Sequence, residues 1–60
     1  MSERFEKVLR AYMEMPIDRL ERAIKGCEEI LERTDLTEYD RNLVKEDYEA
    51  AKKALEQKKY

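Results

Sequence analysis

The sequence predicts an all-α fold, and three observations support this prediction. The chain has one glycine and one proline in 60 residues, so it lacks the residue types that turns and strands require. Apolar residues recur at spacings of three and four, as they do on one face of an α-helix. Charged residues make up 47% of the chain with the two signs interspersed, which is typical of solvent-exposed helix faces. We therefore expect a small helical bundle that forms one domain over residues 1–60.

A first helix is predicted over residues 2–15, with Ser2 as its N-cap. One face of this helix is apolar and the other is charged. The apolar face comprises Met1, Phe5, Val8, Leu9, Tyr12 and Met15. The helix should end near Met15, because the ring of Pro16 disfavours the α conformation in the residue before it. Since few residues remain for a turn, we expect the first helix to bend away from the second at Pro16.

A second helix is predicted over residues 16–33, with Pro16 at the first helical position, where its fixed φ is suitable. Its apolar seam has the spacing of a face that packs against other helices. The seam comprises Ile17, Leu20, Ile24, Cys27 and Leu31. Cys27 is the only cysteine, so we expect a buried, reduced thiol. Gly26 should project away from the seam as a surface glycine, the alternative being close approach of another helix backbone.

A loop over residues 34–37 should lead into a third helix over about 38–58. Two capping boxes compete for its start, Asp35 with Glu38 and Thr37 with Asp40, and we favour Thr37 because Leu36 then stays outside the helix. The apolar line of this helix comprises Val44, Tyr48, Ala51 and Leu55, flanked by Leu43 and Ala54. The short loop predicts that the second and third helices form an antiparallel hairpin.

The first helix should cover the part of the third helix that extends beyond the hairpin, where alanines allow close approach. Two arrangements satisfy this requirement: a compact three-helix monomer, or a homodimer in which the first helix crosses to a partner.

Asp47 lies about 60° from Val44 on the helical wheel, at the edge of the apolar stripe. We expect it either at a boundary, exposed to solvent or paired with an arginine, or in a polar core position that fixes the helix register.

The residue types present argue against an enzyme. The chain has no histidine, one cysteine and no glycine-rich phosphate loop, so we predict no catalytic, cofactor-binding or metal-ligating residues. A net charge of −2 gives no electrostatic footprint for a nucleic acid or a membrane surface. The first 15 residues contain glutamates and no continuous apolar run, which argues against a signal peptide or a transmembrane span. We therefore expect a cytoplasmic protein without cofactors.

Apolar residues outside the predicted core indicate an interface. Tyr39 should project from the outer side of the third helix, where it could form a patch with Met13, Ile30 and Leu43; the alternative is that these residues are scattered over the surface. The sequence therefore favours a non-enzymatic protein–protein interaction or regulatory module, such as an inhibitor or adaptor, that self-associates. Its partner would be a second copy, another protein, or both.

The alternative function is a dimeric nucleic-acid-binding regulator. The end of the third helix is basic, and the predicted hairpin resembles in architecture those of four-helix plasmid copy-number regulators, which bind RNA. The candidate contacts are Lys52, Lys53, Lys58 and Lys59. Glu49 and Glu56 interleave with these lysines and no aromatic residue offers a stacking platform on the same face, so nucleic-acid binding is the weaker hypothesis. A steep salt dependence of binding would distinguish it.

Overall fold

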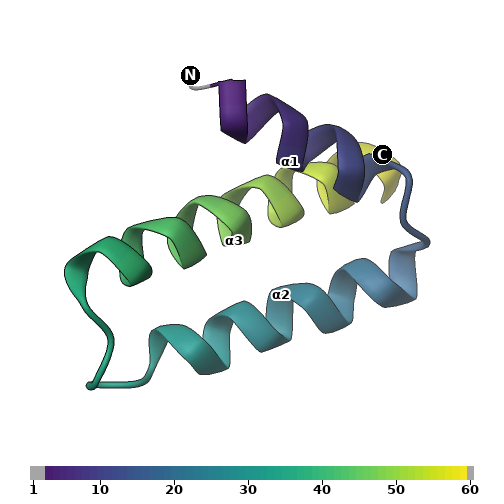
Figure 1. Cartoon of the computed structure of the whole chain (residues 1–60). Helices are drawn as coiled ribbons and strands as arrows, with labels where there is room; N and C mark the ends of the chain where they lie inside the picture. Colours follow the sequence, from purple (N-terminus) through teal and green to yellow (C-terminus); the bar gives the residue numbers. More distant parts are fainter. Residues whose placement is uncertain (1–2, 60) are drawn as a thin grey trace.

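The computed structural model describes residues 3–59, which form three helices joined by two short connections. The helices are α1 (Glu3–Met13), α2 (Ile17–Leu31) and α3 (Glu38–Lys59) (Figure 1). The prediction of an all-helical fold with three helices is confirmed for this part of the chain. Ser2, the predicted N-cap of the first helix, lies outside the described residues.

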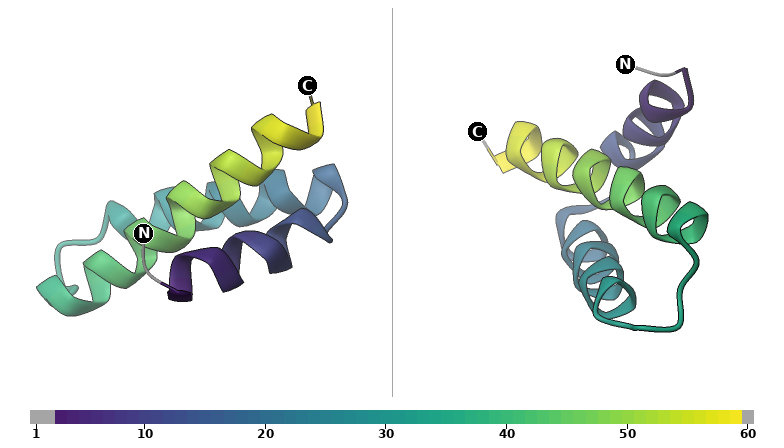
Figure 2. Two further views of the ribbon diagram at one scale, coloured as in Figure 1. Left: turned by 90° about the horizontal axis from the view of Figure 1, so that it is seen from above. Right: turned by 90° about the vertical axis from the view of Figure 1, so that its left-hand side faces the viewer.

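The longest helix, α3, lies at the centre of the structure. α1 and α2 pack against different faces of α3 and have few contacts with each other (Figures 1 and 2). Arg4, in the first turn of α1, pairs with Glu46 and Asp47 in the middle of α3, and the end of α1 at Met13 lies beside Lys58. α1 therefore runs parallel to α3 and covers only its C-terminal half, whereas α2 runs antiparallel to it.

The core consists mainly of small side chains on α3. Ala50, Ala51 and Ala54 are fully buried, as is Leu20 of α2, which is the only large side chain completely buried among residues 3–59. Alanines on two faces of one helix allow a neighbouring helix to approach closely on each side. This burial agrees with the predicted packing role of the alanines.

The apolar seam of α2 is less buried than the sequence pattern predicts. Ile24, Cys27 and Leu31 are half-buried, and Ile17 is 37% exposed. The prediction of a buried Cys27 is therefore wrong. The reason is that α1 packs on α3 and has few contacts with α2, so much of the α2 seam is covered from one side only.

The first connection shows the expected effect of Pro16. The backbone N–H groups of Glu14 and Met15 donate to the carbonyls of Ala11 and Tyr12, which is the tighter i to i−3 pattern of a terminating helix. α1 consequently ends at Met13, two residues before the predicted position. The chain then changes direction, and α1 and α2 leave this connection against different faces of α3 (Figure 2).

The second connection confirms the favoured cap of α3. The backbone N–H of Asp40 donates to Oγ1 of Thr37 at 3.1 Å. The carboxylate of Asp35, the alternative cap, instead accepts hydrogen bonds from the Arg33 guanidinium at 2.8 and 3.0 Å, and these bonds lower the pKa of Asp35. Arg33 lies in the connection and not in a helix, because α2 ends at Leu31, two residues before the predicted end of the second helix.

Two cationic side chains of α3 bind the carboxyl ends of the other helices. The Arg41 guanidinium donates to the carbonyls of Leu31 and Arg33 at 3.0 and 2.9 Å. Nζ of Lys58 donates to the Met13 carbonyl at 2.9 Å and also to that of Met15. Helix ends leave carbonyl groups without intrahelical partners and carry partial negative charge, so both contacts are favourable. α3 thus caps α1 and α2 as well as packing against them.

A Cβ atom built on Gly26 would meet nothing within 4 Å, which supports the interpretation of Gly26 as a surface glycine. Over residues 3–59, none of the helices has the length and apolar character needed to cross a membrane.

Candidate functional site

Among residues 3–59, α1 leaves one end of the α2/α3 hairpin without cover. Tyr39 and Leu43 lie on the same face of α3 as Glu46 and Asp47, because these positions recur at helical spacing. Arg4 pairs with both acidic residues from the first turn of α1, so α1 begins at their level. Leu43 and Tyr39 lie about one and two turns before that level. Tyr39 is accordingly 72% exposed and Leu43 is half-buried.

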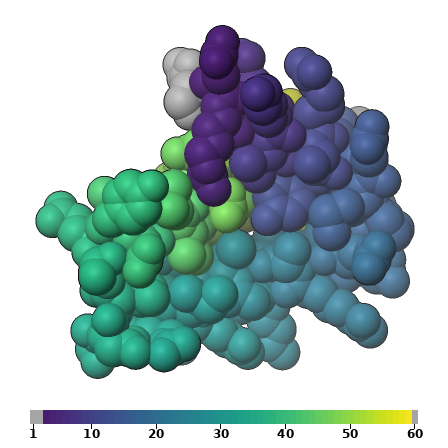
Figure 3. All heavy atoms as spheres, viewed as in Figure 1, coloured from purple at the N-terminus to yellow at the C-terminus, as the bar shows by residue number. Residues whose placement is uncertain are grey.

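Ile30 of α2 lies at the same end of the hairpin, beside the connection between α2 and α3. By helical spacing it lies on the side of α2 away from Ile24 and Glu28, which line a groove on the other side of the hairpin. Ile30 is 39% exposed. We call Ile30, Tyr39 and Leu43 the end patch. In Figure 3 the end of the hairpin, in teal and green, extends beyond the purple start of α1.

Met13 does not belong to the end patch. The predicted interface grouped it with Ile30, Tyr39 and Leu43, but the structure places it at the opposite end of α1, where its carbonyl accepts a hydrogen bond from Lys58. The error arises because the sequence gives no information on how far along α3 the first helix is docked.

Asp47 lies in a polar cluster between the helices. Its Oδ1 accepts a hydrogen bond from Nη2 of Arg4 at 3.1 Å, and Nη1 of the same guanidinium is 3.2 Å from Oε1 of Glu46. The Asp47 side chain is 31% exposed. This geometry agrees with a boundary position paired with an arginine, which is the first of the two predicted roles. The role in fixing helix register stays a prediction.

Two side chains near Asp47 have raised pKa values. Burial raises the pKa of the Cys27 thiol, and the negative charge of Asp47 raises it further. Burial and then Asp47 likewise raise the pKa of the Tyr12 hydroxyl. Because the thiolate is the reactive form of cysteine, this environment suppresses the nucleophilic chemistry that the only thiol could provide.

The four lysines proposed as nucleic-acid contacts all interact with other groups of the chain. Lys52 lies over the ring of Tyr48, with Nζ 5.0 Å from its centroid, and Lys53 lies 5.9 Å from the centroid of Phe5. Lys58 caps α1, and Nζ of Lys59 is 3.8 Å from Oε2 of Glu21. Each of the four lysines is therefore engaged with a different group of the chain, although Lys52 and Lys59 line the same groove between α2 and α3.

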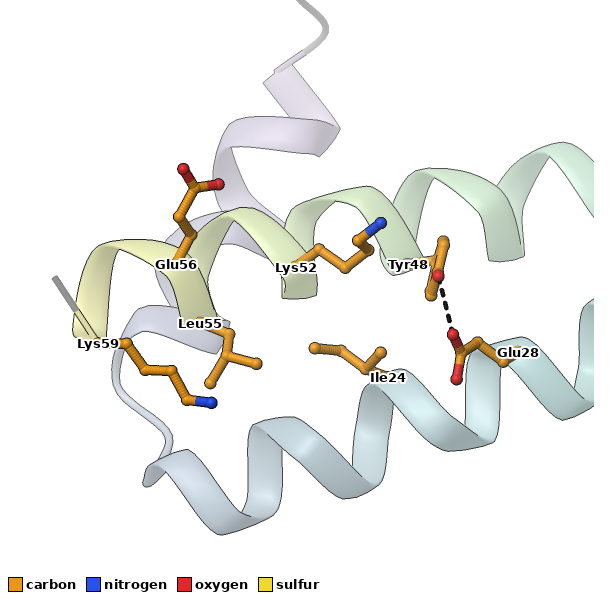
Figure 4. A pocket seen from close by; sticks show the side chains of 7 residues that line it. All are labelled: Ile24, Glu28, Tyr48, Lys52, Leu55, Glu56 and Lys59. Atoms are coloured by element: carbon orange, nitrogen blue, oxygen red, sulfur yellow. Dashed lines mark hydrogen bonds between the residues drawn. The ribbon is translucent and has the colours of Figure 1, made fainter.

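A second candidate surface lies on the other side of the hairpin. A groove of about 420 Å³ runs between α2 and α3, on the side of α3 turned away from the Asp47 cluster. Seven side chains line it: Ile24, Glu28, Tyr48, Lys52, Leu55, Glu56 and Lys59 (Figure 4). None of the seven is fully buried. The Tyr48 hydroxyl donates to Oε2 of Glu28 at 3.0 Å across the groove.

Sequence reasoning missed this groove. Ile24 and Tyr48, which belong to the apolar lines predicted for the second and third helices, both line the groove. Sequence reasoning could not anticipate that α1 would dock on the opposite side and leave the groove open. The same holds for Arg41 and Lys58, whose backbone partners are 8 to 10 and 43 to 45 residues away in the sequence.

Comparisons with known proteins add no functional information. No protein-family model, curated protein or solved structure matches this chain. Within residues 3–59, no three or more cysteine, aspartate or glutamate residues are grouped so that they could hold a metal ion.

Proposed function

We propose that this chain is a small non-enzymatic interaction module that presents a helical surface to a second copy or to another protein. The end patch is the observation that carries this proposal. Ile30 and Tyr39 are 39% and 72% exposed in a chain that completely buries only four apolar side chains among its described residues. Large apolar side chains exposed near one end of a hairpin are the kind of feature that marks an interface.

The position of the end patch supports this interpretation. The patch continues the face of the hairpin against which α1 packs, so a helix from a partner could extend the row that α1 begins. Such a helix would place apolar residues at i, i+3 or i+4 spacing against Ile30, Tyr39 and Leu43. Tyr39 would be the main anchor, since tyrosine contributes a large contact area with few rotatable bonds.

The other functional classes have less support. Burial and then Asp47 raise the pKa of the Cys27 thiol and so disfavour the thiolate, which makes the residue best suited to nucleophilic chemistry poorly placed for it. Binding to a nucleic-acid backbone requires cationic groups that converge on one surface, whereas Lys52, Lys53, Lys58 and Lys59 make separate contacts within the chain. A regulatory role follows only from the proposal that a partner binds.

The proposal can be tested by site-specific photo-crosslinking in cells that express the chain. A photoreactive phenylalanine at position 39 should form discrete crosslinked products, because this side chain is the most exposed member of the end patch. The same residue at position 25, in place of the exposed Lys25 of α2, is the control. Crosslinking at neither position, or equally at both, would contradict the end patch as the binding surface.

A further inference from the structure

The groove between α2 and α3 has an ordered charge pattern. Lys59 and Leu55 lie at one end, Tyr48 and Glu28 lie at the other, and Ile24 lies between them (Figure 4). Nζ of Lys59 extends toward α2, where it is 3.8 Å from Glu21, and the Glu28 carboxylate reaches toward α3, where it accepts the Tyr48 hydrogen bond. At one end of an apolar floor Lys59 therefore lies with Glu21 and Glu56, and at the other end Glu28 lies with Lys52, whose ammonium is over the Tyr48 ring (Figure 4).

This pattern is complementary to itself under a two-fold rotation. When two copies face each other with their α3 helices antiparallel, the Lys59 end of one groove meets the Glu28 end of the other. On α3, residues 52 and 56 are equally far from residue 54, and residues 48 and 59 are nearly so. The rotation therefore brings Lys52 of one copy to Glu56 of the other. It also brings Lys59 to Tyr48, whose hydroxyl is bonded to Glu28. All four pairs across the interface then join opposite charges.

The apolar floor also favours a second copy. Ile24, Tyr48 and Leu55 are half-buried, and Ile17, seven residues before Ile24 on the same face of α2, is 37% exposed. Since Leu20 is the only large side chain that is fully buried among the described residues, the chain buries little apolar surface on its own. Covering the floor would add the burial that so small a domain needs.

We infer that the α2/α3 groove is a pairing surface through which two copies of this chain bind face to face, with antiparallel α3 helices. The inference rests on the proposed function, which names a second copy of the chain as one possible partner. The end patch lies on the opposite side of the hairpin and stays exposed in such a pair.

The test uses two charge reversals, Glu28→Lys and Lys59→Glu, with the molar mass measured by sedimentation equilibrium over a range of concentrations. Each variant alone would place like charges at both symmetric contacts, so its dissociation constant should rise roughly tenfold. An equimolar mixture of the two should pair as well as the wild type, because both symmetric contacts between one variant and the other again join opposite charges. Glu29→Lys, one residue away on the outer side of α2, is the matched control and should pair like the wild type.

Far-UV circular dichroism and thermal melts establish that each variant is folded before its mass is interpreted. A wild-type chain that stays monomeric at all concentrations would overturn the inference, as would a dimer that tolerates both reversals or a mixture that fails to recover pairing. In any of these cases, crosslinks from position 39 would leave the proposed function standing. Their absence, with pairing through the groove intact, would instead remove the end patch from the proposal.

Discussion

Replacing Leu20 by alanine should be the most damaging single change in the core. Leu20 is 0% exposed and is the only large side chain completely buried among residues 3–59. Deleting buried leucine side chains costs about 2–5 kcal/mol, and the surrounding residues are small or half-buried and can partly collapse, so we expect about 2–3 kcal/mol. A domain of 60 residues has a total stability of about 3–9 kcal/mol. The variant should therefore be partly unfolded at room temperature if the wild type lies near the lower limit.

The matched control is Ile17→Ala, one turn earlier on the same apolar seam. Because Ile17 is 37% exposed, its truncation should cost only about 1 kcal/mol. Urea unfolding followed by circular dichroism at 222 nm gives both free energies of unfolding. Equal losses at the two positions would mean that α2 is covered evenly along its seam, and would refute a core centred on Leu20 and the α3 alanines.

Three further predictions concern single contacts. Gly26→Ala should raise the free energy of unfolding by about 0.5–1 kcal/mol in the same urea experiment, because the added methyl group meets open space; a loss would show that another backbone approaches the glycine. Lys58→Met should lower the free energy of unfolding by about 1–2 kcal/mol, since the carbonyls at the end of α1 lose their cation. Lys25→Met, at an exposed position of α2, should be nearly neutral, and equal effects of the two changes would exclude a capping role. Because the folded state raises the pKa of Cys27 above its ordinary value of 9.0, the free energy of unfolding should fall as the pH rises from about 9 through the folded-state pKa. The fall should be smaller in Cys27→Ala, which lacks the thiol. Identical pH profiles of the two proteins would contradict the prediction.

Features that depend on neighbouring residues were predictable from the sequence. The Thr37 cap uses a hydroxyl and a backbone N–H three residues apart, so its residue types alone favour it. Pro16 predicts the end of the first helix because its ring acts on the residue before it. The exposure of Ile30 and Tyr39 followed from helical periodicity in the same way. Each of these features depends on residues within one or two helical turns of each other in the sequence.

Features that depend on how the helices dock were not predictable. The seam of α2 is the most regular apolar pattern in the sequence, yet α3 is the central helix. Its two packing faces are formed largely by Ala50, Ala51 and Ala54, which carry little hydrophobic signal although they are fully buried. The position of α1 along α3 decided which surfaces stay open. It therefore separated Met13 from the end patch and left the opposite groove uncovered.

The caps formed by Arg41 and Lys58 also determine the order in which the chain can become stable during synthesis. α1 and α2 leave the ribosome first, but the cations for their last carbonyls belong to α3, which follows them. The first two helices also have few contacts with each other, so they have little to pack against until α3 emerges. We therefore expect nascent chains that stop before residue 38 to be largely unstructured and open to proteases, and the three helices to fold in a single late step once α3 has emerged.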